Sequence, residues 1–321
     1  MKTVAIGQPT TSGQLARRKP RLSPRQREEL FAYLCISPWL INFVVFVAFA
    51  MIASLGISLF RTNLLNRTAY VGLENYREML TNDKLFWKSL VNTAYYSFAM
   101  VPLGTAVALI IAMILNQDIK GQSFWRMVYY LPSIVSGVAV ALLWAWLYHP
   151  DYGLINSLLD QMGVFRYIPR IKWIFAEATA IPSLIIMGIW GTGGAMLIFL
   201  AGLQSVPTAL YEAATIDGAN AWRRFWAVTL PMLTPTIFFS IIMRIIGSFQ
   251  VFTLSYIMTD GGPNNATLTM VLYLYRKGFQ QFKFGYSSAL AWALFFVILA
   301  LTLLVIRSSE MWVFYEGELK R

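Results

Sequence analysis

The residues with the most distinctive chemistry lie between two apolar segments, at positions 211–233. They comprise two acids, a glycine and two adjacent arginines: Glu212, Asp217, Gly218, Arg223 and Arg224. Asp-Gly is turn chemistry, because glycine readily takes the left-handed conformation that ends a helix. Pro207, which suits a first helical turn, and Asn220 mark the starts of helices on either side of it. We expect a helix-turn-helix, which is either a docking element for another protein or an ordinary solvated loop.

A second distinctive residue is an arginine inside an apolar segment. Arg244 is four residues from both Ser240 and Ser248, so the three side chains share one helical stripe. An arginine in the middle of a membrane span costs ~2.5–3.5 kcal/mol on insertion scales, so it is rarely idle. It either pairs with a neighbouring helix or partner subunit, reaches toward the membrane surface, or recognises an anionic solute.

The composition indicates where these residues are held. The chain has 321 residues, of which 57% are hydrophobic and 13% charged, whereas a soluble domain carries about 25% charged residues. With a mean hydropathy of +0.57, this composition predicts an integral membrane protein. The net charge of +11 is spread between the apolar segments, which suits contacts with lipid headgroups and argues against nucleic acid as a partner.

Six apolar segments are each long enough to cross ~30 Å of hydrocarbon as a helix. They are residues 30–60, 89–115, 127–147, 178–203, 233–258 and 287–306. Backbone polar groups in lipid must be satisfied within the segment, so we expect helices rather than open strands. The fold class predicted is therefore all-α and polytopic, with six transmembrane helices.

The basic residues before the first apolar segment predict a cytoplasmic N-terminus, and six spans return the C-terminus to the same side. We divide the chain into a basic cytoplasmic tail, a six-helix transmembrane domain and a C-terminal cytoplasmic tail, at residues 1–30, 31–306 and 307–321. On this topology the loop at 204–232 is cytoplasmic, and the loops at 61–88, 149–177 and 259–286 are external. The external loop at 149–177 carries an amphipathic piece at 154–160, for which we expect a short surface helix.

The cytoplasmic loop resembles a known family signature. Glu212-Ala213-Ala214, then Gly218, then Val228-Thr229-Leu230-Pro231 resemble the EAA loop of permease subunits of ABC importers, with valine where the pattern has isoleucine at 228. Asp217, just before the glycine, also fits. The resemblance implies that a coupling helix here seats in a groove of an ATPase subunit. The residues implied in coupling are Glu212, Ala213, Ala214, Asp217, Gly218, Leu230 and Pro231.

Other segments resemble the sugar-importer branch of that family, the MalF-like type I permeases. They are Val71-Gly72-Leu73-Glu74-Asn75-Tyr76, Gly247-Ser248-Phe249-Gln250-Val251-Phe252 and Asp260-Gly261-Gly262-Pro263. The resemblance implies the type I importer fold in a bacterial inner membrane. It also implies a heterodimer with a second permease, two ATPase subunits and an extracytoplasmic solute-binding protein.

The chain lacks the groups expected of an enzyme. It contains no G-x-x-x-x-G-K-[ST] phosphate loop, and no triad or paired acids lie within the apolar segments. Cys35 and His149 are its only cysteine and histidine, so neither a disulfide nor a metal cluster can be built around them. We expect a transport subunit with no cofactor of its own, and ATP and Mg²⁺ on the partner ATPase.

A saccharide crossing lipid needs polar and aromatic partners for its hydroxyls. The candidate path residues, from the fourth and fifth apolar segments, are Trp190, Gly191, Gly194, Arg244, Ser248, Phe249 and Gln250. Helical geometry favours the serine–arginine stripe, whereas the resemblance favours the region around Phe249. The glycines indicate either close helix packing or a local break that widens a solute site.

The function predicted is a saccharide path in an ATP-driven importer, with an oligosaccharide as solute and, if Arg244 recognises it, an anionic one. One alternative is a permease for a non-sugar solute such as a glycerol phosphate. Another is an ion-coupled secondary transporter, which would carry acids within its spans. Every Asp and Glu here falls in a loop, a tail or at a segment edge, which argues against that class.

Overall fold

The computed structural model describes residues 23–63 and 68–314. The chain divides into two compact units, residues 1–54 and 55–321, which are described separately. Secondary structure is almost entirely helical, and the strands in the described part are two short ones. Most basic residues of the expected N-terminal tail, from Lys2 to Arg21, lie outside the described residues.

The described part of the N-terminal unit is a helical segment, whose last element ends at Ser58, just beyond the unit boundary. It consists of α1 (Pro24–Asn42), the π-helical segment η1 (Phe43–Ala48) and α2 (Phe49–Ser58). The helix begins at Ser23, whose hydroxyl accepts from the Gln26 N–H while the Gln26 side chain accepts from the Ser23 N–H. This capping box satisfies two otherwise unpaired N–H groups and starts the helix several residues before the apolar segment.

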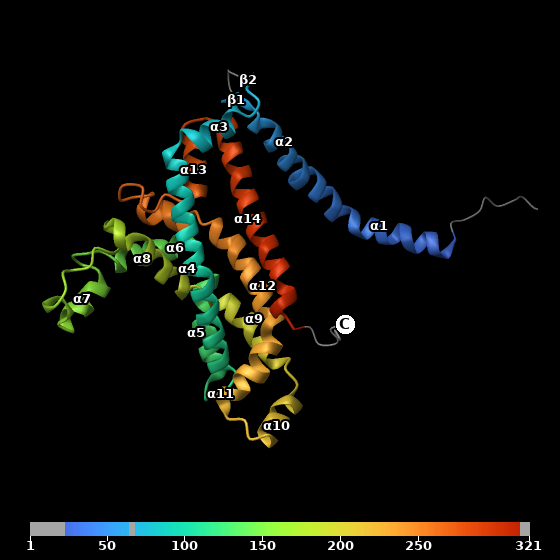
Figure 1. Ribbon diagram of the computed structural model, residues 1–321, viewed down its shortest axis with the longest axis vertical. Coiled ribbons are helices and arrows are strands. Elements are labelled where there is room, and N and C mark those ends of the chain that lie inside the picture. The colour runs from blue at the N-terminus through green and yellow to red at the C-terminus, as the bar shows by residue number, and fades with distance from the viewer. Residues whose placement is uncertain (1–22, 64–67, 315–321) are drawn as a thin grey trace, which may run out of the picture. The chain divides into compact units, whose positions relative to one another are not determined.

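One end of the second unit carries a hairpin and a short helix (Figure 1). Strands β1 (Phe60–Thr62) and β2 (Thr68–Tyr70) pair antiparallel, with Phe60 opposite Tyr70. Helix α3 (Glu74–Thr81) follows, and the Asn75 side chain donates to the carbonyls of Ser58 and Phe60 at 2.7 and 3.0 Å. Asn75 thereby fixes this end of the unit against the end of α2.

Helix α4 (Lys84–Leu115) packs against most of the other spans of the second unit. Asp83 caps it by accepting from the N–H groups of Leu85 and Phe86 at 2.9 and 3.1 Å. A cap at this position extends the helix five residues beyond the apolar segment that predicted it. Helix α4 contacts α8, α9, α12 and α13, so it supports the elements around the candidate path.

Two of the expected spans are bent rather than straight. Helices α5 (Gln122–Ile134) and α6 (Gly137–Leu147) meet at 97°, and α8 (Glu177–Trp190) and α9 (Gly193–Gln204) meet at 47°. The expectation of one continuous helix over 127–147 was therefore wrong. Close packing accompanies the second break, because a Cβ on Gly193 would lie 2.2 Å from the carbonyl oxygen of Tyr129.

Between the bent pairs lie α7 (Leu154–Gln161) and two 3-10 turns, η2 (Val164–Arg166) and η3 (Trp173–Phe175). Helix α7 confirms the short amphipathic helix expected at 154–160. Its Asn156 is buried and donates to the carbonyls of Pro150 and Ile171, both at 2.9 Å. This side chain closes the segment into a compact loop.

The opposite end of the second unit is a helical hairpin (Figure 1). It contains α10 (Thr208–Ile216) and α11 (Ala221–Arg224), and the π-helical segment η4 (Phe225–Thr229) joins α11 to α12 (Leu230–Phe249). Residues 221–249 therefore form one helix of 29 residues. The expected second helix from Asn220 is confirmed, and it continues without interruption into the fifth span.

The fifth span ends earlier than its apolar segment predicted. Helix α12 stops at Phe249, and the carbonyl of Val251 is satisfied by the Thr269 hydroxyl at 3.0 Å rather than by a continuing helix. The turns that follow are η5 (Ser255–Thr259), α13 (Met270–Tyr275) and η6 (Arg276–Gln280), and the last span is α14 (Phe284–Trp312). The expectation of a single helix over 233–258 was wrong for its last third.

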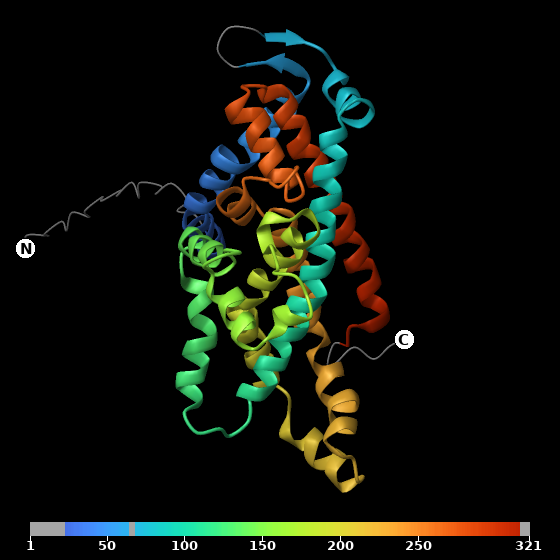
Figure 2. The ribbon, with the colours of Figure 1, turned by 90° about the vertical axis from the view of Figure 1, so that its left-hand side faces the viewer.

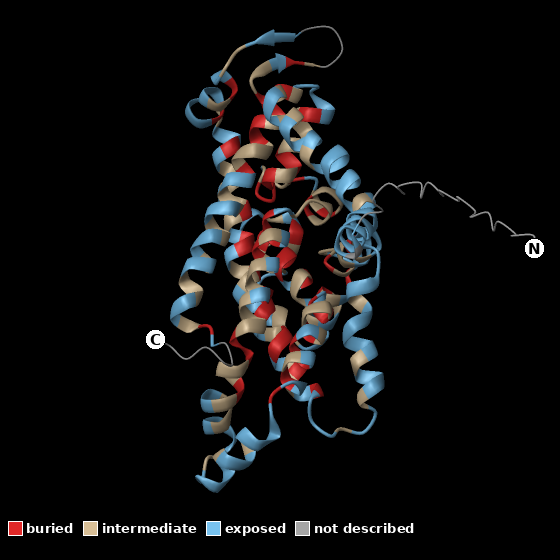
Figure 3. Cartoon of the chain, turned by 90° about the vertical axis from the view of Figure 1, so that its right-hand side faces the viewer, coloured by how far each residue is buried: buried red, intermediate tan, exposed pale blue. Residues whose placement is uncertain are grey.

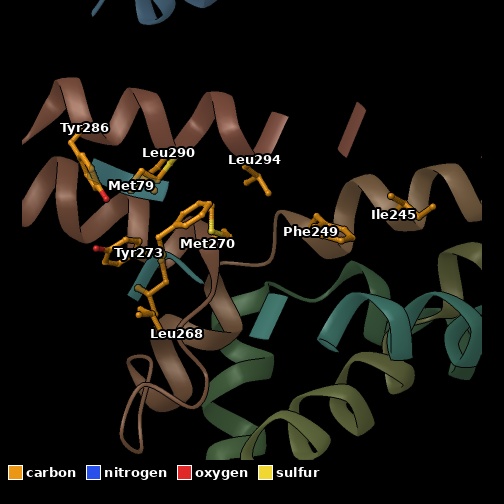
Figure 4. Packing of buried hydrophobic residues seen from close by; sticks show 11 residues of the cluster. Met79, Ile245, Phe249, Leu268, Met270, Tyr273, Tyr286, Leu290 and Leu294 are labelled. Atoms are coloured by element: carbon orange, nitrogen blue, oxygen red, sulfur yellow. The ribbon is translucent and has the colours of Figure 1, made fainter. Parts of the chain in front are cut away.

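Among the residues that the structure describes, four helices are long and apolar enough to cross a membrane, and each bent pair can count as one further span. The six-span prediction is confirmed in this form. Buried residues lie along the middle of the second unit, whereas the hairpin of α10 and α11 is almost wholly exposed (Figure 3). The largest buried cluster joins the end of α12 to α13 and α14, with Phe249, Met270 and Leu290 among its members (Figure 4).

Candidate coupling hairpin and solute cavity

The turn of the hairpin has the geometry that its sequence predicted. Gly218 has φ +74°, and the N–H groups of Asp217 and Ala219 donate to the carbonyls of Ala213 and Ala214 at 3.0 and 2.9 Å. Asn220 then starts α11, because its side-chain oxygen accepts from the Arg223 N–H at 2.8 Å. The left-handed glycine and the Asn cap reverse the chain between the two helices. Pro207 differs slightly from expectation, since it caps α10 and the first helical residue is Thr208.

Two side-chain contacts hold the arms of the hairpin together. The hydroxyls of Tyr211 and Thr229 are 3.0 Å apart, and Arg224 donates to the Thr215 hydroxyl at 3.3 Å. Thr229 lies in η4, which continues directly into α12. The tip is therefore tied to the helix that leads into the bundle, through Leu230 and Pro231 in its first turn.

The outer surface of the hairpin is open. Glu212, Ala213, Asp217 and Gly218 are exposed and Ala214 is half-buried, and among the described residues Glu212 forms no ion pair. Apolar side chains at the same end are also exposed, Ile216 at 87% and Trp222 at 69%. Large exposed apolar side chains beside an acid suit a docking surface, and docking of this hairpin on another protein stays a prediction. The hairpin extends beyond the rest of the second unit (Figure 2).

A cavity of about 300 Å³ lies where the break between α8 and α9 faces α12. Residues from α4, from α5 and from the last turn of α8 complete its wall. The candidate path residues that the structure brings together here are Gly191, Gly194 and Arg244. At the break the helix that forms one wall is interrupted, and the glycines there leave space because they carry no side chains.

Arg244 is held against the backbone of the central helix. A Cβ on Gly104 of α4 would lie 2.4 Å from Nη1 of Arg244, so the guanidinium occupies the space that the glycine leaves. Within the described part of the chain, Arg244 Nε is buried and has no hydrogen-bond partner, and the same holds for the Ser240 hydroxyl one turn earlier. The polar stripe expected on the fifth span therefore carries unsatisfied groups at the cavity.

The other candidate path residues lie outside this cavity's lining. Ser248 is buried and donates to the Ile245 carbonyl at 3.3 Å, and Phe249 packs in the core against Phe98 with ring centroids 6.4 Å apart. Gln250 is exposed and lines a separate apolar groove against α14. Trp190 is 43% exposed and meets Trp144 edge-on, at 5.8 Å between centroids. Their proposed contact with solute stays a prediction.

Sequence reasoning named Gly191, Gly194, Ser240 and Arg244 but not the other residues around the cavity. Gly188, Thr192 and Gly104 shape its wall or the seat of Arg244. Gly188 and Thr192 lie beside the glycines that were named, so their proximity in the sequence is a usable signal. Gly104 lies in a different helix, and only the packing of α4 on α12 brings it to Arg244.

A second charged cluster lies at the opposite end of the unit, which carries β1, β2 and α3. The carboxylate of Asp83 accepts hydrogen bonds from the hydroxyls of Tyr273 and Tyr286, and the Lys277 ammonium lies 5.2 and 5.5 Å from the centroids of those two rings. Burial raises the pKa of Asp83, but the hydrogen bonds from the two tyrosines and from the Phe86 N–H, with the charge of Lys277, outweigh burial and hold it below its ordinary value.

Comparison with known proteins settles the family. Residues 100–311 match the family described as binding-protein-dependent transport system inner membrane component. The chain belongs to this family. It is therefore a membrane component of a transport system that works with a binding protein, and the family resemblance of its motifs is confirmed.

Several relatives of this permease cover nearly the whole chain. It is 41% identical to the probable ABC transporter permease protein YesP of Bacillus subtilis, over 91% of this chain and 94% of that one. It is 34% identical to the trehalose/maltose transport system permease protein MalF of Thermococcus litoralis, over 88% and 95%. It is 33% identical to the arabinooligosaccharides transport system permease protein AraP of Bacillus subtilis, over 86% of this chain and 88% of that one.

A solved structure confirms the fold. A bacterial ABC transporter involved in the import of the acidic polysaccharide alginate contains a chain that superposes with a TM-score of 0.76 and 23% identity, covering 88% of this permease and 96% of that chain. The all-α, multi-pass architecture of an importer permease is thus shared. At this identity the likeness concerns the fold alone.

Proposed function

We propose that this permease forms part of the path for a saccharide in an ATP-driven importer, and that the hairpin of α10 and α11 couples the path to an ATPase. The relatives named for trehalose/maltose and for arabinooligosaccharides support a saccharide, in particular an oligosaccharide. The observation that carries the proposal is the single helix over 221–249, which joins the exposed hairpin to the cavity.

This helix is suited to transmit movement. About 20 residues separate Arg224 at the hairpin from Arg244 at the cavity, which corresponds to ~30 Å of helix. A shift of the hairpin moves the α12 wall of the cavity, because the Tyr211–Thr229 contact ties both hairpin arms to that helix. The opposite wall is the break between α8 and α9, a place where the backbone can hinge.

The assembly we propose contains a second permease as heterodimer partner and two ATPase subunits that hold ATP and Mg²⁺. An extracytoplasmic solute-binding protein delivers the saccharide. The hairpin end faces the cytoplasm of a bacterial cell, both termini lie on that side of the inner membrane, and the end with β1, β2 and α3 faces outward. The basic residues near the N-terminus support this orientation.

The test of coupling uses two hairpin variants. Glu212→Arg reverses an exposed charge, and Gly218→Val places a branched side chain at φ +74°, a conformation that costs ~1–2 kcal/mol or more. We expect each variant to lower uptake and the recovery of ATPase with the purified permeases by ~10-fold, a change of about 1.4 kcal/mol in binding. The binding protein should still bind saccharide normally.

The matched control is Asp118→Arg, which makes the same kind of charge change in the exposed segment between α4 and α5, outside the hairpin. This variant should retain ATPase and uptake. Wild-type uptake and ATPase recovery in both hairpin variants would exclude the hairpin as the coupling element.

A further inference from the structure

We infer that the saccharide carried by this permease bears an oxyanion, a uronate carboxylate or a phosphate ester, and that Arg244 binds it in the cavity between α12 and the α8–α9 break. This inference rests on the proposed function, because it names the chemical class of the transported saccharide. It adds a recognition role in the membrane-spanning part of the importer, in addition to selection by the binding protein.

The first support is the unpartnered Nε of Arg244. Arg244 lies in the membrane-spanning part of α12, its Nε is buried, and no carboxylate from the described residues lines the cavity. Acids of the described membrane-crossing helices lie near the helix ends, as Glu28, Glu177 and Glu310 do. An arginine at membrane depth normally pairs or lines a solute path, so an arginine that faces a cavity with an unpartnered Nε favours an anionic ligand.

The second support is how the guanidinium is seated. Gly104 removes the side chain that would displace Nη1, so α4 provides a backbone seat for the arginine. The Ser240 hydroxyl, one turn earlier on the same face of α12, is also buried without a partner among the described residues. A planar guanidinium suits two oxyanion oxygens, and a neighbouring hydroxyl suits a sugar hydroxyl or a third oxygen.

The third support is the space available. The cavity of about 300 Å³ lies at the lower limit of ligand-sized pockets, and Gly188, Gly191 and Gly194 contribute to its wall. Glycines at a helix break leave room and bring backbone close to a solute. The wall combines Arg244 with small, hydroxyl-bearing and apolar side chains, and no other charged side chain of the described residues lines it.

The test measures uptake by the complete importer, with its binding protein, in proteoliposomes. The probes are matched pairs: digalacturonate with its carboxyl-reduced neutral counterpart, and a disaccharide phosphate with its dephosphorylated form. We expect wild type to take up at least one acidic member. Arg244→Met should lower that uptake by ~10-fold or more, equivalent to about 1.4 kcal/mol, while uptake of the neutral counterpart changes by less than ~2-fold. Arg244→Lys should retain part of the acidic uptake.

Two further variants separate recognition from folding. Gly104→Ala keeps the charge but forces Nη1 to move, so it should lower the ratio of acidic to neutral uptake. Arg126→Met is the matched control, because Arg126 in α5 also has a buried Nε without a partner in the described residues but does not line the cavity. Its acidic-to-neutral ratio should equal that of wild type.

Each remaining outcome decides the question. Uptake of neutral saccharides alone by wild type would overturn the inference and leave the proposed function standing. Equal loss of acidic and neutral uptake in Arg244→Met, with loss of the assembled complex and an unchanged ratio in Gly104→Ala, would show that Arg244 pairs with another subunit. If wild type imports no saccharide of either kind, the proposed function itself fails, and the inference fails with it.

Discussion

Asp83 and Arg244 are both charged side chains packed into the same helical unit, yet their surroundings differ in kind. Asp83 accepts from two tyrosine hydroxyls and from two backbone N–H groups, and Lys277 lies over the rings of the same tyrosines. Arg244 has a buried Nε without a partner in the described residues, and it faces a cavity. The Asp83 carboxylate has several hydrogen-bond partners within the chain, whereas the Nε of Arg244 has none among the described residues.

This difference separates a structural charge from one available to a ligand. The hydrogen bonds to Asp83, at the start of α4, join that helix to α13 and α14, so this network contributes to stability. A buried arginine Nε without a partner lowers stability, and in Arg244, unlike in Arg126, the side chain also lines a cavity that a ligand can enter. Stability and transport should therefore respond in opposite ways at the two sites.

The largest effect expected is on stability, from Asp83→Ala. The change leaves two tyrosine hydroxyls and the N–H groups of Leu85 and Phe86 without their acceptor, so we expect the free energy of unfolding to fall by ~3–5 kcal/mol. Thermal unfolding of the purified permease measures it. The exposed Asp118→Ala should shift stability by less than ~0.5 kcal/mol. Equal shifts in stability in the two variants would mean that Asp83 has no special structural role.

Acid should weaken the same network. The folded pKa of Asp83 lies below its ordinary value of 3.8. Its stabilising contribution is therefore fully present above that value and is lost as the pH falls through the lower folded pKa. The stability difference between wild type and Asp83→Asn should be constant from about pH 7 to 5 and should shrink below about pH 4. A difference that stays constant down to the lowest pH measured would contradict the assigned direction.

A smaller loss is expected when one donor is removed. Tyr286→Phe deletes one hydrogen bond to the Asp83 carboxylate, and a bond to a charged group is worth ~1.5–3 kcal/mol. Because Tyr273 still donates, we expect the lower part of this range in thermal unfolding. Tyr95→Phe, on the exposed face of α4, is the control and should leave the midpoint unchanged. A midpoint in Tyr286→Phe equal to that of the control would mean that this bond contributes nothing.

Arg244→Met should have the smallest effect on stability, and any change should be an increase. It removes a charge that has no partner for its Nε in the described chain and leaves an apolar side chain of similar reach, so we expect stability within ~1 kcal/mol of wild type or slightly higher. The same thermal assay measures it, beside the transport assay in which acidic uptake falls. A stability loss as large as that of Asp83→Ala would mean that Arg244 has a protein partner.

Much of the fold followed from local patterns along the chain. Apolar segments of sufficient length gave the spans, because lipid leaves helices as the way to satisfy the backbone. The Asp217-Gly218 turn followed from glycine's access to positive φ, and the structure confirms it with φ +74°. The resemblance of the EAA loop, built on residue types at fixed spacing, was enough for the family, which the match over residues 100–311 confirms.

The bends in the helices and the set of residues that line the cavity did not follow from those patterns. Hydropathy does not distinguish a straight span from a pair meeting at 97°, since both are equally apolar. Beyond the end of α12 at Phe249, the Val251 carbonyl accepts from the Thr269 hydroxyl, a contact that hydropathy does not report. Helical periodicity placed Ser240, Arg244 and Ser248 on one stripe, but it did not indicate which part of the molecule that stripe faces.

Residue types and spacing along the chain thus specify a six-span permease with a charged hairpin and a lone arginine in its fifth span. Whether a charge is satisfied depends on atoms contributed by distant helices, and packing alone supplies those atoms. Asp83 meets Tyr273 and Tyr286, while Arg244 meets Gly104 and an open cavity. Sequence patterns indicate which interactions a side chain can form. The packing of the helices decides which of those interactions are formed within the chain and which remain available to a ligand.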